Sequence, residues 1–427
     1  MNSDLEVLGS TGSASSELNR SQSIVFHLAI FSIAFLILFS RRPDAVLNAQ
    51  FFAEDGTYWY ADAYQFGWRC LLMPQVGYLN TLSRLIALFS LPFPLAFAPL
   101  VMNLCALIVQ ILPVNLFLSS RFSAIPFWIR TVASFLYLAL PNSAEIHANT
   151  TNVQWHLGLL AFLVLAAPGR DTIGRIFLDF PALFLILVNG PLGILLIPIA
   201  LLFWWKRKGR WSTAYLVALL PGAFLQGLIM VASHARRIGT NGASLGRLVS
   251  ILGRQVFMGC LLGTKTISQL MYHARILSIL EMIATVIGVG IVLYALRSGA
   301  LELRLFILFS ALIFAACLAH PLAGGTGYQW DIMRGAGNFG RYFFFPMLAF
   351  LAALLWIVRT AKARTLRHAA LAILLLMPIG IFRDWRYRPF LDMDFKGFAA
   401  AFERAAPGTK FVVSINPDWE MYLTKKP

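Results

Sequence analysis

Hydrophobic residues along this chain occur in long blocks that are separated by short polar connections. After a polar N-terminal stretch, apolar segments recur from Ile24 to Phe382. A membrane-spanning helix needs about 20 predominantly apolar residues, and shorter segments can be extended by flanking aromatic residues. The pattern therefore predicts an all-α polytopic membrane protein with about 11 spans. The predicted spans are 24–39, 94–118, 127–141, 156–167, 175–189, 191–205, 213–232, 275–296, 303–319, 343–358 and 368–382.

Two polar regions flank this predicted transmembrane domain, which extends over residues 24–382. Residues 1–23 are polar and rich in serine and glycine, so we expect a disordered N-terminus. The first apolar segment lacks a small-residue cleavage site and is expected to remain as an uncleaved span. Residues 383–427 contain an amphipathic stretch and the strand-like "GTKFVVSI". They are too few for an independent core, so we expect a small C-terminal α/β segment that docks on the outer face.

Basic residues in the short connections set the expected orientation. With the N-terminus in the cytoplasm, connections such as "KRKGR" and "RTAKARTLR" fall on the cytoplasmic side, as the positive-inside rule requires. The C-terminus is then periplasmic, and the protein is expected in the cell inner membrane. The longer outer loops are 40–93, 142–155, 233–274 and 320–342. Residues 77–90 would reverse every later loop if they spanned the membrane, so we expect a helix in the outer interface, with Arg84 on its polar face.

Composition supports the membrane class and excludes several others. The chain is 59% hydrophobic and 13% charged, unlike an average soluble domain. The net charge of +16 comes from basic residues between apolar segments, which suits anionic lipid and gives no reason to expect nucleic acid. The four cysteines, at positions 70, 105, 260 and 317, lack the spacing of metal ligands.

An acidic pair stands out in the first outer loop. In "FFAEDGTYWY", Glu54 and Asp55 are adjacent, although the chain has only 19 acidic residues. Acidic residues stabilise the first turn of a helix, so one interpretation is a helix cap. The other is a catalytic carboxylate that takes a proton from an acceptor hydroxyl group.

The order of these features resembles the GT-C superfamily of polytopic glycosyltransferases, which includes protein O-mannosyltransferases and lipid A aminoarabinose transferases. The resemblance covers residues 24–205 best: one span, an outer loop with an acidic pair, an interfacial helix and a long second span. A weaker similarity lies in "GNFGRYFFFP". The resemblance implies a polyprenyl-phosphate sugar donor and a base in the first outer loop. Asp55 is the better match for this base, with Glu54 orienting the acceptor or exchanging roles with it.

This sequence departs from the GT-C pattern at the interfacial helix. Many members read His-Pro-Pro-Leu there, whereas this chain reads "PQVGYLN". The departure leaves the subfamily and the acceptor open.

Transfer of a sugar from a lipid phosphate also requires cations that stabilise the departing phosphate. Arginine suits this role because its guanidinium group binds phosphate bidentately. Snorkelling of these side chains to ordinary lipid headgroups is the alternative. The candidates on the expected outer face are Arg236, Arg237, Lys265, Arg341 and Tyr342.

The loop "EIHANTTNVQWH" is unusually polar for a connection between two spans. Asparagine, glutamine and tryptophan suit a sugar, which offers hydroxyl groups and an apolar ring face. The alternative is that the loop only caps two helices. Nine residues separate His147 from His156, which is no metal-ligand spacing, and a lone "DMD" at 392–394 is common by chance. We therefore expect no required cofactor and assign no metal. The candidates for contact with sugar or acceptor are His147, Asn149, Asn152, Gln154 and Trp155.

Together these features favour a membrane glycosyltransferase, a hexosyl- or pentosyltransferase of the inverting GT-C type. It would move a sugar from a polyprenyl-phosphate donor to an envelope glycan, lipid or protein acceptor on the outer face, among membrane lipids. Two alternatives remain: a transporter or flippase for lipid-linked glycans, and an O-antigen polymerase or ligase. A transporter would more naturally place ionisable residues in the middle of its spans, which are nearly free of charge here.

Overall fold

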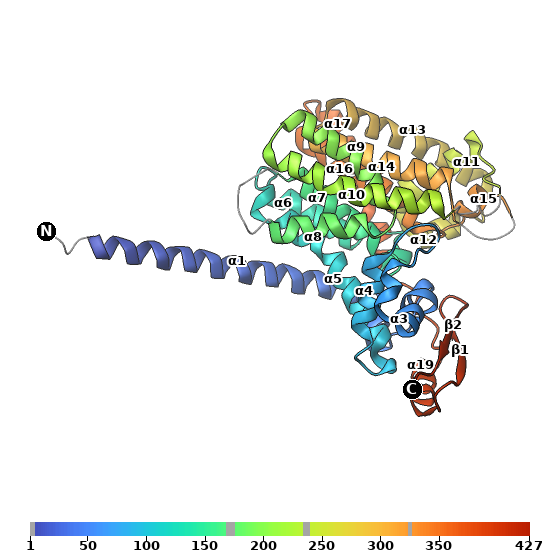
Figure 1. Ribbon diagram of the computed structural model, residues 1–427. Helices are drawn as coiled ribbons and strands as arrows, with labels where there is room; N and C mark the ends of the chain where they lie inside the picture. Colours follow the sequence, from blue (N-terminus) through green and yellow to red (C-terminus); the bar gives the residue numbers. More distant parts are fainter. Residues whose placement is uncertain (1–4, 168–175, 234–239, 323–326) are drawn as a thin grey trace.

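The structure is a computed structural model of the 427-residue chain and describes residues 5–167, 176–233, 240–322 and 327–427, with side chains from residue 22 onward. Figure 1 shows a bundle of helices from which α1 projects, and a smaller lobe that carries α3, α19 and the two strands. The helices of the bundle are α1 (Leu5–Arg41), α5 (Ala98–Leu118), α6 (Phe127–Leu138), α7 (Val153–Ala166), α8 (Ile176–Leu187), α9 (Leu192–Arg207), α10 (Arg210–Ala232), α13 (Ala274–Ser298), α14 (Leu301–Ala319), α16 (Gly340–Thr360), α17 (Arg364–Leu374) and α18 (Met377–Asp384).

Shorter elements connect the bundle helices or form the lobe. The lobe and first loop contain α2 (Asp44–Leu47), the π-helix η1 (Asp55–Tyr60), α3 (Ala61–Phe66), the 3₁₀-helix η2 (Gly67–Leu72), α4 (Thr81–Ser90) and the 3₁₀-turn η3 (Leu95–Phe97). Later connections contain the 3₁₀-turns η4 (Ser120–Phe122) and η5 (Ala144–Ile146), then α11 (Leu245–Ser250), the π-helix η7 (Ile251–Met258), α12 (Gly259–Leu270) and α15 (Gln329–Met333). The C-terminal segment contains α19 (Phe395–Arg404), β1 (Lys410–Ile415) and β2 (Trp419–Thr424).

The all-α membrane class is confirmed. In the described chain, 8 helices are long and apolar enough to cross a membrane: 22–41, 95–118, 210–232, 245–270, 274–298, 301–319, 340–360 and 364–384. All of these except 245–270 coincide with predicted spans, and the other four predicted spans form shorter helices, α6 to α9, of 12, 14, 12 and 16 residues. The predicted number of about 11 spans is thus reached only when helices shorter than a perpendicular span are included.

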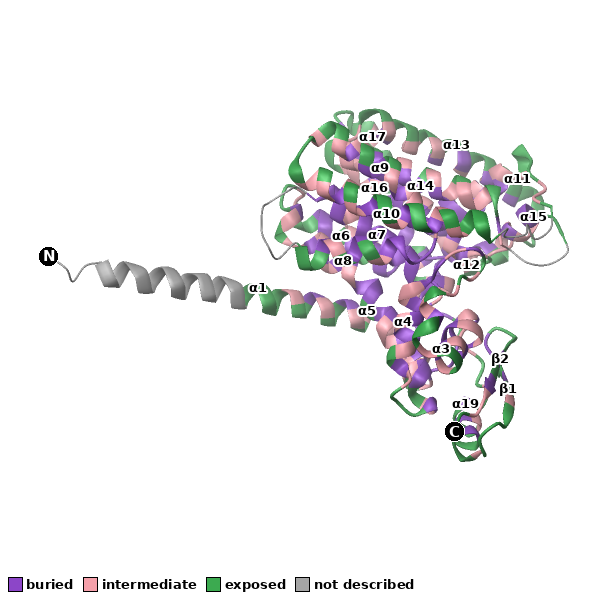
Figure 2. Cartoon of the chain, in the orientation of Figure 1, coloured by how far each residue is buried: buried purple, intermediate pink, exposed green. Residues whose placement is uncertain are grey.

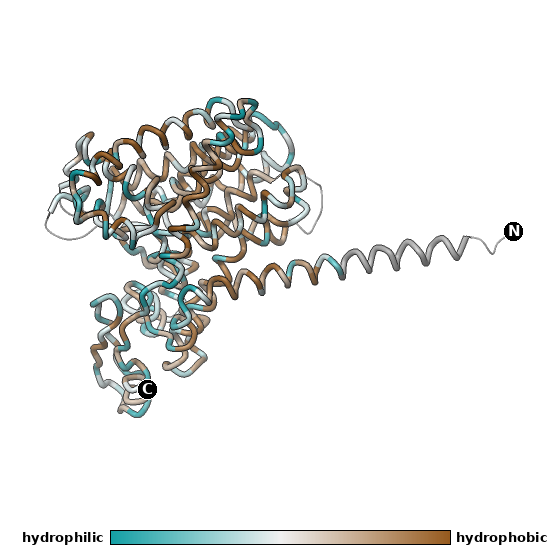
Figure 3. Tube along the Cα trace, turned by 180° about the vertical axis from the view of Figure 1, so that it is seen from behind, coloured by the Kyte–Doolittle hydropathy of each residue, from teal (hydrophilic) through white to brown (hydrophobic). Residues whose placement is uncertain are grey.

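The surface of the bundle is apolar where lipid would contact it. Phe224 on α10 is 70% exposed and Val286 on α13 is 68% exposed. Figure 3 shows hydrophobic colouring along most of the bundle and along the inner part of α1, and Figure 2 shows many exposed residues on the helices of the bundle. Apolar patches this extensive are rare on soluble monomers, and they match a hydrocarbon environment.

Loops meet at one end of the bundle, which we call the loop end. It comprises residues 138–152, 188–191, 240–250 and 327–340. The N–H group of Gly190 donates to the Leu79 carbonyl oxygen at 2.8 Å, and that of Gln329 donates to Thr240 at 3.0 Å. The predicted outer loop 40–93 therefore contacts the connection at 188–191, and the predicted outer loops 233–274 and 320–342 contact each other.

Arginines form ion pairs at the opposite end of the bundle, which we call the basic end. It comprises residues 119–130, 165–167, 207–211, 299–303 and 359–364. Arg121 pairs with Asp179 at 2.6 Å, and Arg207 pairs with Glu302 at 2.8 Å. The short basic connections and the longer polar loops thus lie at opposite ends of the bundle, as expected from the sequence. The side of the membrane that each end faces stays a prediction.

Residues 245–270 lie within the predicted outer loop 233–274 but are almost entirely helical. Both halves of this segment contact the loop end, because Arg247 pairs with Asp331 at 2.8 Å and the Thr264 hydroxyl donates to Asn142 at 2.9 Å. Gly263 interrupts the helix with a φ of 78°. Both ends of the segment therefore lie at the loop end, while its middle packs on α16, where Phe257 lies 5.0 Å from Phe350 between ring centroids.

The C-terminal segment shares a second hydrophobic core with the first outer loop. Val413 and Met421 are opposite each other in the antiparallel pair β1–β2, and both are buried against this core. Phe395 on α19 packs edge-to-face on Phe51 at 5.1 Å between ring centroids. The predicted small α/β segment is thus present, and it completes a lobe that neither part could form alone.

The expectation that Arg84 lies on a polar face of an interfacial helix is wrong. Arg84 on α4 is only 1% exposed. Its guanidinium group pairs with Asp62 at 2.7 Å and lies over the Trp59 ring at 5.1 Å. Because α4 contributes side chains to the core of the lobe, this arginine is a buried, paired residue within the lobe.

Candidate functional site

Asp55 is buried at the start of η1, where the chain turns after Ala53 with a positive φ of 45°. Its side chain is 1% exposed and accepts four hydrogen bonds. The N–H and hydroxyl groups of Thr150 donate at 3.0 and 2.6 Å, and those of Thr151 both donate at 2.7 Å. The carboxylate therefore fastens the first outer loop to the loop between α6 and α7.

Burial and hydrogen bonding act in opposite directions on the Asp55 carboxyl group. Burial raises its pKa, the four donors lower it, and the net result is a pKa of about 6. At neutral pH the group is ionised, but both oxygens already have partners. This arrangement stabilises a loop and leaves little room for an acceptor hydroxyl group.

Glu54 has different surroundings from its neighbour. It is only partly buried, and the Thr151 side chain, which also holds Asp55, forms a hydrogen bond with it. Burial raises the pKa of Glu54, while the Arg341 guanidinium lowers it and the Glu145 carboxylate raises it. The charges of the nearby Glu145–Arg341 ion pair therefore act on the Glu54 carboxyl group.

That ion pair joins the loop between α6 and α7 to the start of α16. The Arg341 guanidinium forms a short contact with the Glu145 carboxylate, and the Arg341 N–H group donates to the same carboxylate at 3.1 Å. The guanidinium also donates to the Leu322 carbonyl oxygen at 3.2 Å and lies over the Tyr342 ring at 4.8 Å. Arg341 keeps 24% of its side chain exposed, so it is fixed in position but accessible.

Tyr78 adds a phenol to this group from the loop before α4. Burial raises its pKa to about 12, and Tyr342, Arg341 and Glu54 all act on it electrostatically. The phenol is therefore a neutral hydrogen-bond donor at physiological pH. We call the five residues Glu54, Tyr78, Glu145, Arg341 and Tyr342 the Glu54–Arg341 cluster.

Three of the predicted sugar-contacting residues stabilise their own loop. The Asn149 amide donates to the Glu145 carbonyl oxygen at 2.7 Å, and the Asn152 amide donates to the same oxygen at 3.0 Å. His147 is 1% exposed, and its ring packs on Tyr387 at 5.1 Å. Burial and the neighbouring Arg42 hold the pKa of His147 well below 6.5, so it is neutral. These three side chains shape the loop that carries Glu145.

Gln154 and Trp155 also have buried polar atoms without a hydrogen-bond partner among the described residues, as do His147 and Asn152. The atoms concerned are the Gln154 Oε1 and the Trp155 Nε1. Gln154 lies against Gly190, where a Cβ atom would come within 1.8 Å of Oε1 and where φ is +86°. Trp155 lies 6.2 Å from Tyr342 between ring centroids, at the edge of the cluster. Buried polar atoms without partners are costly, so a polar ligand is a natural partner for them.

Lys265, another predicted phosphate contact, lies outside the cluster. Lys265 on α12 is exposed, and its ammonium group contacts the Arg386 carbonyl oxygen at 3.2 Å. No contact among the described residues joins it to Arg341. Arg236 and Arg237 lie outside the described residues.

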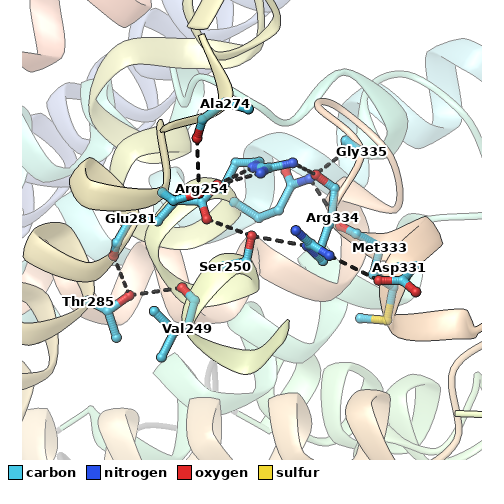
Figure 4. Close-up of polar contacts among 12 residues, drawn as sticks. Val249, Ser250, Arg254, Ala274, Glu281, Thr285, Asp331, Met333, Arg334 and Gly335 are labelled. Atoms are coloured by element: carbon cyan, nitrogen blue, oxygen red, sulfur yellow. Dashed lines mark hydrogen bonds and ion pairs between the residues drawn. The ribbon is translucent and has the colours of Figure 1, made fainter. Parts of the chain in front are cut away.

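A polar network anchors the segment that precedes Arg341 (Figure 4). Arg254 on η7 pairs with Glu281 on α13 at 2.5 Å and donates to the Arg334 carbonyl oxygen at 2.8 Å. The Ser250 hydroxyl donates to Glu281 at 2.7 Å and accepts from Arg334 at 3.1 Å. The turn after α15 is therefore tied to two helices.

Gln255, the next residue on η7, connects this turn to the loop that carries Glu145. Its amide donates to the Met333 carbonyl oxygen at 3.0 Å and also to Gly335. The Asn142 amide donates to the Gln255 side-chain oxygen at 3.1 Å. The two segments that present Arg341 and Glu145 are thus joined through one glutamine.

The sequence pointed to part of this cluster. The acidic pair, Arg341 and Tyr342 were predicted as site residues, and all but Asp55 belong to the cluster. Glu145 belongs to the polar loop "EIHANTTNVQWH" but was not predicted as a site residue. No feature of the sequence indicated a role for Tyr78. No group of three or more His, Cys, Asp or Glu residues in the described chain could hold a metal ion.

Comparison with known proteins gives limited similarity. No protein-family model and no curated protein matches the chain. Crystal structures of the Archaeoglobus fulgidus oligosaccharyltransferase are similar at 11% identity, with a TM-score of 0.42 for the enzyme tethered to an acceptor peptide and 0.44 for the apo form. The similarity covers 89% of this chain and 57% or 58% of those structures, so this chain spans little more than half their length.

Proposed function

We propose that the protein is a membrane glycosyltransferase of the GT-C type. It takes a sugar from a polyprenyl-phosphate donor and transfers it to an envelope glycan, lipid or protein acceptor on the outer face of an inner membrane. The observation that carries the proposal is the Glu54–Arg341 cluster, which combines a partly buried carboxylate and an accessible arginine at the loop end. A carboxylate and a cation are the two groups that this transfer requires.

The reaction has one step at the anomeric carbon. The acceptor oxygen attacks this carbon while its bond to the phosphate oxygen breaks, and the electron pair leaves with the phosphate. Glu54 takes the hydroxyl proton of the acceptor. The glycosyl centre passes through an oxocarbenium-like state, and attack opposite the leaving group inverts its configuration.

We assign the base to Glu54 and a positioning role to Asp55, which exchanges the roles first expected from the sequence. The reason is accessibility, because four donors from Thr150 and Thr151 occupy the Asp55 carboxylate. Glu54 is partly exposed, and its raised pKa makes it a better proton acceptor once it is ionised.

Arg341 is the proposed contact for the departing phosphate. A guanidinium group has five N–H donors, and its contacts with Glu145 and Leu322 leave others for a ligand. The Tyr78 and Tyr342 phenols would add hydrogen bonds to the phosphate. Arg236, Arg237 and Lys265 remain proposed contacts for more distant parts of the donor. Gln154 and Trp155 are proposed to bind the sugar, and His147, Asn149 and Asn152 to shape their loop.

Purified protein in lipid nanodiscs, supplied with a panel of polyprenyl-phosphate sugars and candidate acceptors, tests the proposal. We expect release of free polyprenyl phosphate and a glycosylated acceptor, with no reaction from nucleotide sugars. Movement of an intact lipid-linked glycan between leaflets, without cleavage, would favour the transporter instead.

Donor binding gives a second measurement that does not need the acceptor. Arg341→Ala should weaken binding of the donor, and Arg341→Lys should restore it only in part because an ammonium group cannot bind bidentately. Lys396→Ala is the matched control, because this lysine on α19 is exposed and has no proposed role in donor binding. Unchanged donor affinity in Arg341→Ala would remove the proposed phosphate contact.

A further inference from the structure

A large apolar cavity lies in the half of the bundle that is closer to the basic end, away from the Glu54–Arg341 cluster. Its volume is about 470 Å³, and it lies between α5, α6, α7, α14 and α16. Its walls are mainly aromatic and aliphatic and include Val114, Phe117, Phe162, Phe306 and Leu351. Cavities of this volume accommodate small ligands in proteins.

The cavity has the length of one membrane leaflet. Along α16 its lining extends from Leu348 to Arg359, which corresponds to about 16 Å at 1.5 Å per residue. The hydrocarbon core of a bilayer is about 30 Å thick, so the cavity covers about half of it. A single acyl chain that enters from the basic end would fill this length.

A positively charged side chain lies where the cavity meets the basic end. Arg359 lines the cavity in the last turn of α16, is exposed, and has no partner among the described residues. The other charged residue in the lining, Glu302, is paired with Arg207 at 2.8 Å. The rim therefore presents one uncompensated cation to the headgroup region, where anionic lipids are attracted to basic residues.

From the length, the lining and the charge of this cavity, we propose that it binds one acyl chain of an anionic phospholipid from the leaflet at the basic end, with the lipid phosphate at Arg359. The site is separate from the proposed transfer reaction. A polyprenyl-phosphate donor fits it poorly, because its phosphate would have to lie at the opposite end from Arg341. A negative result for this lipid site would therefore leave the proposed function untouched, and a failure of the proposed function would leave the lipid site untouched.

Native mass spectrometry of the full chain after delipidation tests the site. The probes are phosphatidylglycerol and phosphatidylcholine with the same acyl chains. We expect the protein to retain one phosphatidylglycerol more tightly than phosphatidylcholine. Arg359→Gln should weaken phosphatidylglycerol binding about fivefold and remove this preference, whereas Arg359→Lys should keep most of it. Arg364→Gln is the matched control, because this arginine lies at the same end outside the cavity lining.

Filling the cavity provides an independent variant. Ala352→Phe and Ala133→Phe place a ring among the lining residues and should abolish retention of the acyl chain. Ala311→Phe on the exposed face of α14 should not change it. Equal retention in the filled and unfilled proteins would overturn the proposal. So would equal binding of both lipids by the unaltered protein, or competition by polyprenyl phosphate at the same site.

Discussion

Glu54 and Asp55 occupy consecutive positions but have separate tasks in the proposed site. Asp55 ties the first loop to Thr150 and Thr151, whereas Glu54 lies in the field of Arg341 and Glu145. The sequence predicted that this pair belongs to the site. It could not divide the roles, because the threonines that occupy Asp55 are 95 and 96 residues away along the chain.

Substitution at each carboxylate should separate stability from transfer. Asp55→Asn presents an amide group to donors that need an acceptor, so we expect a loss of about 1–3 kcal/mol in the free energy of unfolding. Glu54→Gln should leave stability nearly unchanged and lower the transfer rate by about two to four orders of magnitude. Denaturant unfolding and transfer assays on the same preparations measure both effects. If Asp55→Asn is stable and inactive while Glu54→Gln keeps full activity, our assignment is reversed.

The pH dependence of transfer should report the ionisation of Glu54. A base acts only when it is deprotonated, and burial raises the pKa of Glu54 above its usual 4.5. The rate should therefore fall as the pH decreases through this raised pKa. Because the Glu145 carboxylate raises the pKa of Glu54, Glu145→Gln should move the inflection to lower pH. Rate profiles between pH 4 and 8 check this, and an acid limb that persists in Glu54→Gln would assign it to another group.

Among the elements, long apolar helices were predictable and the segment over residues 245–270 was not. The spans 213–232 and 343–358 were predicted close to α10 and α16 because a single apolar run defines each. Residues 245–270 have arginines and glycines within the apolar sequence, and the partners of these arginines lie in α13 and α15. Their helical form depends on tertiary contacts that no local pattern shows.

The Arg254–Glu281 pair on these elements should be worth more than the Arg247–Asp331 pair. The first pair is 9% and 5% exposed, and the second is 27% and 38% exposed. Arg254→Met leaves a buried carboxylate without its cation and should cost about 3–5 kcal/mol. Arg247→Met should cost much less, because solvent screens the more exposed pair.

The double variant Arg254→Met/Glu281→Leu is the control for this comparison. It removes both charges, so it should recover much of the stability that the single variant loses. Denaturant titration in detergent micelles measures all three proteins. Equal losses in Arg254→Met and Arg247→Met would show that burial does not strengthen the first pair.

The whole molecule has two unlike ends, and this asymmetry was the most predictable large-scale feature. Positive charge in short connections and polarity in long loops are local properties, so they can be counted along the sequence. The lobe was only partly predictable, because its core joins residues near position 51 to residues near position 421. Pairing at such a distance is set by complementary packing, which the hydropathy pattern does not encode.

The orientation of these two ends decides where the proposed reaction takes place. In a variant without native cysteines, Gly327→Cys places a thiol at the loop end, where a Cβ atom meets nothing within 4 Å. Lys208→Cys places one in the exposed connection after α9 at the basic end. If the positive-inside rule holds, an impermeant thiol reagent added to intact cells should label the first and spare the second, and permeabilised cells should show both labelled. The labelling of permeabilised cells is the control for accessibility of each thiol. The reverse result in intact cells would put the Glu54–Arg341 cluster in the cytoplasm, where a donor presented on the outer leaflet could not reach it.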